Sequence, residues 1–519
     1  MQKRFSQKGE IAMGTMLSFM SLGIGYMISI LYTPFMLRIL GQSEYGLYTL
    51  VASTASYLGM LSFGFDVSYV KFYFQEKKKG EEAVARLNGM YLLIFTGISL
   101  LSLVAGGILV SFLPQLFQSK LTLAEIDKAQ VLMVVMVIDI ALTFPASLFR
   151  SYITANEKFV FQKLVQILNN VLSPFLALPL LLMGFASTAL VMVTLVINIS
   201  VAIWNITYCI KKLNMKLSFR NVDFKLLKAM SAFSGFIFIN IIVDQINWNV
   251  DKFILGIYEG TIAVAVYGIG AQISGYYRSF SSAVSNQFIP SVNKLVSESD
   301  DNQALLKLMQ KVGRVQSMIL FPLCIGLLFY GEVFIQLWAG KDYKDSYSVM
   351  MILVIPLTIP LVQSLGIEIQ RAKNMHQFRS IVYFLIAILN VFLSVPLCKL
   401  YGAVGCAIGT AISLILGNGI AMNWYYHCKC KLNMFLFWKK IGSFALVMIL
   451  PTFVGYMTKL FLLEKTASSL LLCGLIFSAT YFLSLYLWGI ETHEKEALRR
   501  LMKKLQEKTK SKKNSKKNI

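Results

Sequence analysis

A succession of long apolar runs constrains this chain more than any other feature, since most of them extend for about 18 to 25 residues. A helix needs about 20 apolar residues to cross about 30 Å of hydrocarbon, whereas a transmembrane strand needs only about ten. Hydrophobic residues make up 56% of the 519 residues and charged residues only 14%, a balance that does not fit a soluble protein. The runs therefore predict an all-α integral membrane protein and exclude a porin-like barrel.

Charged and turn residues divide the apolar runs into about fourteen predicted transmembrane helices. The connections between them are short, and the longest, around residues 290–313, is typical of a short helix with mixed charges. This leaves no room for a catalytic domain outside the membrane. The predicted spans are residues 11–33, 46–70, 87–112, 128–149, 161–183, 187–210, 231–254, 262–285, 314–338, 347–369, 379–398, 403–426, 441–459 and 468–490.

The basic residues are distributed very unevenly between the two sides that these spans define. Of the 49 lysines and arginines, 39 fall on the side of the N-terminus and 8 on the opposite side. Short loops rich in these residues stay in the cytoplasm, so both termini are predicted to be cytoplasmic. The net charge of +23 then reflects membrane orientation, and the sequence gives no reason to expect nucleic-acid binding. In the basic tail, residues 491–519, we expect a surface helix and a lysine-rich end attracted to anionic lipid.

A faint internal repeat suggests that the chain contains two related halves. Ile-Leu-Gly at residues 39–41 with Glu44 matches Ile-Leu-Gly at residues 254–256 with Glu259, at the same offset. The matched segments are six predicted spans apart, so the two copies would have the same orientation in the membrane. The predicted organisation is two pseudo-symmetric six-helix lobes, residues 1–210 and 211–426, then two helices in residues 427–490 and the tail 491–519.

Three segments carry a family resemblance. They read PFMLRILGQSEYGLY at residues 34–48, DKFILG at 251–256 followed by AVAVY at 263–267, and YGAVGCAIGT at 401–410. In this order and spacing they resemble Wzx-type flippases, polysaccharide transporters of the multidrug/oligosaccharidyl-lipid/polysaccharide exporter superfamily.

The resemblance implies two lobes around a central cavity and alternating access, with undecaprenyl-diphosphate-linked sugar units carried outward across a bacterial plasma membrane. It also implies a polymerase of the same pathway as a partner. Peptidoglycan-precursor flippases of this superfamily carry basic residues in their first helix, whereas residues 11–33 contain none here. A capsule, exopolysaccharide or teichoic-type unit is therefore favoured as the substrate.

Polar residues gather on one face of the predicted span 231–254 and its outer end. A lipid-facing surface would not tolerate them, because polar and charged groups at membrane depth are costly and usually face a cavity or a partner. We therefore expect this stripe to line the cavity. Its aromatic member could stack on a sugar ring or could belong to the core. The stripe consists of Asn240, Asp244, Asn247, Trp248 and Asp251.

Three aspartates are candidates for coupling transport to a proton or a sodium ion. Asp244 is predicted near the middle of its span, where a carboxylate could exchange a proton or hold a cation. Asp251 lies nearer the outer face, and Asp139 lies within the span 128–149. A fixed ion pair between Asp244 and Arg278 is the alternative for the first of them.

The second half of the predicted span 262–285 is too polar to face lipid. Arg278 lies there and could hold a diphosphate through its bidentate guanidinium, while Tyr277 and Gln287 could meet sugar hydroxyls. The sequence shows no metal-ligand spacing and no nucleophile constellation, so no resident cofactor and no enzyme is expected. A cation-coupled multidrug exporter remains the alternative, ahead of a membrane polymerase or acyltransferase.

Overall fold

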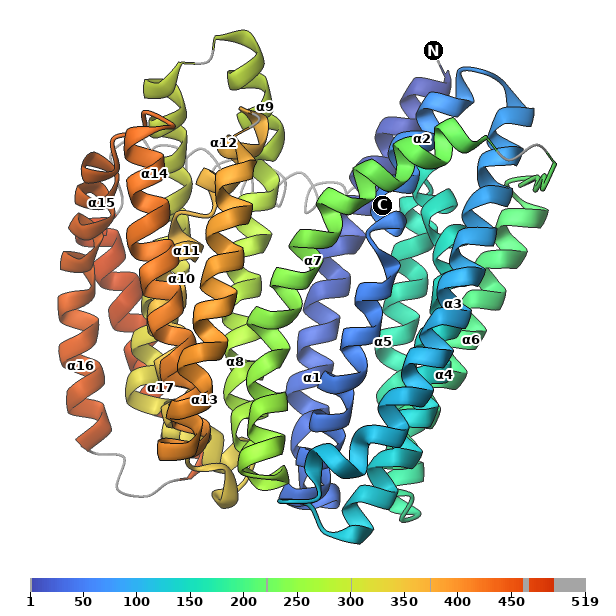
Figure 1. Cartoon of the computed structure of the whole chain (residues 1–519). Coiled ribbons are helices and arrows are strands. Elements are labelled where there is room, and N and C mark those ends of the chain that lie inside the picture. The colour runs from blue at the N-terminus through green and yellow to red at the C-terminus, as the bar shows by residue number, and fades with distance from the viewer. Residues whose placement is uncertain (1, 221–222, 300, 374, 461–465, 490–519) are drawn as a thin grey trace, which may run out of the picture. The chain divides into compact units, whose positions relative to one another are not determined.

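A computed structural model describes residues 2–220, 223–299, 301–373, 375–460 and 466–489, and within these ranges the chain is helical with no strand (Figure 1). The predicted amphipathic helix of the tail lies outside the described residues. The chain forms two compact units. The first comprises residues 1–278, 338–360 and 374–424, and the second comprises residues 279–337, 361–373 and 425–519.

The first unit contains most of the long helices and two large apolar clusters. Leu132, Leu255 and Val264 are buried in one cluster, and Tyr69, Tyr91 and Phe95 in the other. Its helices are α1 (Gln2–Ser56), α2 (Phe65–Lys77), α3 (Glu81–Phe117), α4 (Leu123–Ala155), α5 (Phe159–Leu182), α6 (Ala186–Lys211), α7 (Phe224–Tyr258), α8 (Thr261–Ser285, as far as residue 278), α11 (Ser346–Val362, as far as residue 360) and α13 (His376–Leu414).

The long helix α13 reverses direction at Gly402, which has the left-handed φ of 56° and ψ of −133°. A Cβ placed on Gly405 would lie 1.9 Å from the carbonyl oxygen of Leu397, and one on Gly409 would lie 2.7 Å from Ser394 Oγ. Residues on the two sides of Gly402 therefore pack antiparallel against each other. The chain then continues through a π-helical segment, Ile415–Ala421, into α14 (Met422–Cys428).

The first helix, α1, has a similar break at Gly41, with φ 74° and ψ 174°. Tyr32 and Tyr48 lie on opposite sides of this break and interact electrostatically. In a straight helix they would be about 24 Å apart, too far for such an interaction, so the chain reverses here as well (Figure 1). Residue ranges 11–33 and 46–70 were predicted as separate spans, and this reversal separates them.

Ten described helical segments are long and apolar enough to cross a membrane, or eleven if the bent pair α11 and α12 (Leu365–Ala372) counts as one span. Two of these segments, Met20–Lys77 and Gln377–Cys428, contain the reversals at Gly41 and Gly402. Counting each as two crossings and adding the more polar α8 would give the predicted fourteen. The all-α membrane fold is confirmed, while the count of fourteen stays a prediction.

The predicted span 46–70 is not one continuous helix. The α-helix gives way to a 3-10 helix at Tyr57–Ser62, and Phe63 and Gly64 then adopt left-handed backbone angles, with φ of 48° and 78°. The second part of this crossing is therefore α2, which starts at Phe65. Hydropathy could not predict the interruption, because residues on both sides of it are apolar.

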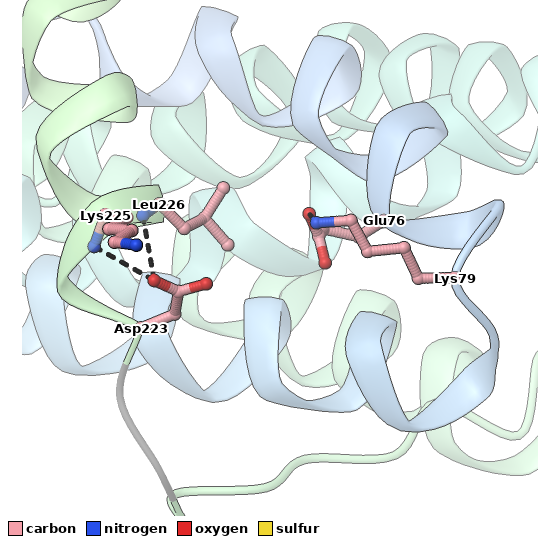
Figure 2. A network of polar contacts seen from close by, with 5 residues as sticks. All are labelled: Glu76, Lys79, Asp223, Lys225 and Leu226. Atoms are coloured by element: carbon pink, nitrogen blue, oxygen red, sulfur yellow. Dashed lines mark hydrogen bonds and ion pairs between the residues drawn. The ribbon is translucent and has the colours of Figure 1, made fainter.

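The start of α7 is fixed by a local cap. Asp223 Oδ1 accepts hydrogen bonds from the backbone N–H groups of Lys225, at 2.9 Å, and Leu226, at 3.1 Å (Figure 2). These donors have no partner within the helix, so the cap defines where α7 begins. At the end of α2, the buried Glu76 pairs with Lys79 at 2.7 Å.

The second unit has its own apolar core, which includes Tyr330, Phe444 and Phe477. Burial raises the pKa of its Cys430 thiol to about 11, so this cysteine is mainly protonated and unreactive at neutral pH. Its helices are the end of α8, α9 (Ile289–Glu298), α10 (Asn302–Trp338, as far as residue 337), α12, α15 (Met434–Ser443), α16 (Ile449–Leu460) and α17 (Ala467–Ser484), with a final π-helical segment Leu485–Gly489.

The short helix expected around residues 290–313 is present as α9, which is followed directly by α10. The six-helix lobes, their boundaries after residues 210 and 426, and the sequence repeat stay predictions.

Candidate functional site

Within the first unit, the structure brings together three of the predicted site residues on α7 and α8. The Arg278 guanidinium lies over the ring of Trp248, 3.7 Å from its centre, in a cation–π contact. The exposed carboxylate of Asp244, one helical turn from Trp248, acts electrostatically on Arg278. Trp248 is 38% exposed and Arg278 is only half-buried, so both side chains remain accessible.

Helix α1 adds aromatic and hydroxyl groups to this face of α8. The rings of Tyr26 and Tyr276 meet edge to face with centres 5.5 Å apart, and the Tyr276 hydroxyl hydrogen-bonds to Ser29. Gln272 Nε2 donates to the Tyr276 hydroxyl at 2.7 Å and to Thr33 Oγ1 at 3.4 Å. We call the set Tyr26, Asp244, Trp248, Tyr276 and Arg278 the aromatic–arginine site. It combines a cation, a carboxylate and three aromatic rings.

Asp251, in contrast, is only 2% exposed. Its carboxylate accepts hydrogen bonds from the hydroxyls of Tyr267, at 2.5 Å, Ser394, at 2.9 Å, and Thr410, at 2.5 Å. Ser394 and Thr410 also contact Asn390 Oδ1, at 2.8 and 3.3 Å. Helices α7 and α8 and both arms of α13 therefore meet at one carboxylate surrounded by oxygen atoms, which we call the Asp251 cluster.

The other predicted residues of the stripe and of α8 are placed differently. Asn240 is exposed and Asn247 half-buried on α7. Tyr277 is 2% exposed, and its hydroxyl lies 2.8 Å from Thr358 Oγ1 of α11, so this side chain holds two helices together. Gln287 is exposed in the second unit, where its amide donates to the carbonyl of Ala283.

Asp139 lies at the contact between α4 and α6. Both of its carboxylate oxygens accept hydrogen bonds from Asn198 Nδ2, at 2.9 and 3.0 Å. The partner that the structure gives this aspartate is thus an amide of the same unit, and its role in coupling stays a prediction.

Sequence reasoning did not single out Tyr267, Asn390, Ser394 or Thr410. The available signal was the same cost of polar groups at membrane depth, because Asn390, Ser394 and Thr410 all interrupt apolar runs. These residues carry no charge, however, and only the reversal at Gly402 brings the two arms of α13 to Asp251.

A polar network joins the ends of four helices of the first unit. Glu44, near the reversal of α1, pairs with Lys128 of α4 at 2.7 Å and accepts a hydrogen bond from the backbone N–H of Ser187 at 3.0 Å. Glu125 of α4 accepts hydrogen bonds from Ser43, at 2.6 Å, and from Thr261 of α8, at 3.0 Å. We call these residues the end network. It holds α1, α4, α6 and α8 together at one end.

Comparison with known proteins agrees with this architecture. Residues 35–348 match the model of a family described as polysaccharide biosynthesis protein. A putative O-antigen transporter of Shigella flexneri is 21% identical over 412 residues, which cover 78% of this chain and 95% of that protein.

Two solved structures share the fold. A lipid II flippase, MurJ, in an inward closed conformation superposes with a TM-score of 0.69 at 17% identity, over 91% of this chain and 99% of that one. An inward-facing multidrug resistance transporter of the MATE family superposes with a TM-score of 0.63 at 13% identity, over 80% and 99% of the two chains. At these identities the likeness concerns the fold alone.

The family match spans more than half of the chain, and the putative O-antigen transporter aligns over nearly its full length. These matches and the transporter fold confirm the resemblance to Wzx-type polysaccharide flippases. The chain therefore belongs to the polysaccharide biosynthesis protein family.

Proposed function

We propose that this multi-pass membrane protein is a flippase that carries undecaprenyl-diphosphate-linked oligosaccharide repeat units from the inner to the outer leaflet of a bacterial plasma membrane. Both termini would lie in the cytoplasm, as the distribution of basic residues favours. The units would serve a capsule, exopolysaccharide or teichoic-type polymer, with a polymerase of the same pathway as partner. The protein acts as a transporter in this proposal, without catalysis.

The observation that carries the proposal is the contact of Arg278 with Trp248 beside Asp244. An arginine can bind a diphosphate through two parallel hydrogen bonds, and an indole offers a flat face to a sugar ring. In the structure the guanidinium lies over that face. A bound diphosphate would draw the cation away from Trp248, and the ring would then be free to contact the first sugar.

Alternating access requires that one end of the transport path close while the other opens. The end network supports such closure, because it consists of one ion pair and several hydrogen bonds between helices. At the same end, α1 and α8 approach closely: a Cβ on Gly46 would lie 1.9 Å from the carbonyl oxygen of Thr261. Contacts of this kind can break and re-form without disturbing an apolar core.

We assign coupling to the Asp251 cluster in preference to Asp244. The carboxylate and the hydroxyls that contact it are oxygen groups, which suit a proton or a hard cation such as sodium, and the charge of Lys252 on the same helix also acts on Asp251. Asp251 and Trp248 lie within one turn of α7, so a change at the cluster can be transmitted to the aromatic–arginine site through a single helix.

The proposal can be tested with the full chain in liposomes that contain a fluorescent undecaprenyl-diphosphate oligosaccharide. The wild type should make the inner-leaflet sugar accessible to an external oxidant, whereas Arg278→Ala should not, although it inserts normally. Arg86→Ala, which removes an exposed arginine of α3, is the matched control. Ethidium export without any movement of the lipid-linked sugar would instead support the multidrug exporter, and activity of Arg278→Ala equal to that of the wild type would refute the site.

A further inference from the structure

A groove of about 310 Å³ lies between the C-terminal halves of α4 and α6 in the first unit. Its walls are mostly apolar and include Leu142, Phe149, Ile199 and Ile203. No member of the aromatic–arginine site or of the Asp251 cluster lines it. The groove is therefore a separate feature, and its volume is too small for an oligosaccharide headgroup.

Two polar side chains open into one end of the groove. Arg150 of α4 is exposed, and its guanidinium has no hydrogen-bond or ion-pair partner among the residues that the structure describes. Asn205 of α6 is only 7% exposed, and its amide likewise has no partner in the described part of the chain. Because its side chain lines the groove, the Asn205 amide is available to hydrogen-bond to a ligand there.

The remaining polar groups of the groove are already bonded. The hydroxyls of Thr143 and Ser147 donate to carbonyls of their own helix, those of Asp139 and Phe144. At the other end of the groove, Asn198 donates to the carboxylate of Asp139. An anion would be attracted to the Arg150 end and repelled from the Asp139 end.

The depth of these groups matches the shape of a membrane lipid. Arg150 lies five residues before the end of α4 at Ala155, about 7.5 Å along the helix, which is headgroup depth for a membrane-spanning helix. From there the apolar wall runs eight residues back to Leu142, about 12 Å toward the middle of the helix.

We propose that this groove binds one anionic phospholipid of the phosphatidylglycerol type. Its phosphate contacts Arg150 and Asn205, and part of one acyl chain lies along the wall formed by Leu142, Ile199 and Ile203. Arginine pairs with phosphate through two hydrogen bonds, and basic pockets between transmembrane helices are suited to anionic headgroups. The site is independent of the transport function proposed above.

The experiment measures phosphatidylglycerol bound to the purified full-length protein by native mass spectrometry after mild delipidation. Arg150→Ala should reduce binding about fivefold, as expected for one cation near a lipid phosphate. Ala146→Phe, which fills the groove without changing charge, should reduce it at least as much. Arg86→Ala, which removes an exposed arginine outside the groove, should have no effect.

Phosphatidylcholine and undecaprenyl phosphate serve as competing probes. The proposal predicts that neither displaces phosphatidylglycerol from the wild type at equal concentration. Displacement by undecaprenyl phosphate would overturn it in favour of the polyprenyl carrier. Equal losses in Arg150→Ala and Arg86→Ala, or unchanged binding in Ala146→Phe, would overturn it in favour of general attraction to surface charge.

Discussion

Polar side chains on two neighbouring turns of α7 differ in their exposure. The side chains of Trp248 and Asp244 are exposed, and Arg278, which interacts with both, is only half-buried. Three residues further on, Asp251 is almost completely buried and accepts three hydroxyl hydrogen bonds. One sequence stripe therefore contains exposed side chains and a buried carboxylate, and substitutions should distinguish the two by their effects on stability and transport.

The largest effect on stability is expected for a substitution in the Asp251 cluster. Asp251→Leu removes the acceptor of the buried Tyr267 hydroxyl and leaves Ser394 and Thr410 with their contacts to Asn390, and a buried hydroxyl without a partner costs about 1 to 3 kcal/mol. The variant should lose about 1 to 3 kcal/mol of stability, which thermal unfolding in detergent followed by size-exclusion chromatography would show. Asp251→Asn keeps one acceptor and should lose less. Wild-type thermal stability of Asp251→Leu would contradict the closed cluster.

Arg278→Ala should affect transport strongly and stability only slightly. The fold should be nearly unaffected, because the guanidinium is only half-buried, while transport of the lipid-linked sugar falls about tenfold to a hundredfold. Initial transport rates in liposomes, normalised to inserted protein, measure this change. Arg278→Lys keeps the charge without the bidentate geometry and should fall between the two. A large loss of stability with little loss of transport would assign Arg278 to the core.

Ser394→Ala is a smaller change in the Asp251 cluster. It removes one of the three hydroxyls that contact Asp251 and should cost about 1 kcal/mol. The matched control is Ser200→Ala on α6, where an exposed hydroxyl donates only to its own helix. Thermal unfolding of both variants should show a shift only for Ser394→Ala, and equal shifts would count against a stabilising role of the cluster.

The smallest effect is expected for Trp248→Phe at the open end. Phenylalanine keeps an aromatic face but offers a smaller one to the first sugar, so affinity for the lipid-linked sugar should fall about twofold to threefold. Trp248→Ala should lower it further. Concentration dependence of transport gives these affinities. Identical affinities for all three side chains would place Trp248 outside the binding surface.

The membrane fold could be predicted from the sequence because it depends on the local cost of placing residues in lipid, and the polar face expected on α7 rests on the same cost. Long apolar runs can be stable as helices in lipid, and a residue such as Asp244 or Arg278 cannot face lipid wherever it lies. Such arguments need no knowledge of distant residues. They also predict which face of α7 is polar, since helical periodicity alone defines a face.

The Asp251 cluster could not be predicted from such local arguments. The hydroxyl partners of Asp251 on α13 are 143 and 159 residues away in the sequence, at Ser394 and Thr410. The partner of Asp139 is Asn198, 59 residues away. Whether a buried carboxylate faces a cavity or a set of hydroxyls depends on how the helices pack, and hydropathy carries no information about that packing.

The reversal at Gly402 joins the two arms of α13 so directly that the length of the connection fixes how the second arm lies against the first. With almost no loop to absorb a change in length, one added residue would advance the second arm by about 1.5 Å and turn it by about 100°. Thr410 would then leave Asp251, although the insertion itself lies eight positions away. An evolutionary insertion or an engineered tag at Gly402 would thus first disrupt the hydrogen bonds of the buried Asp251 carboxylate.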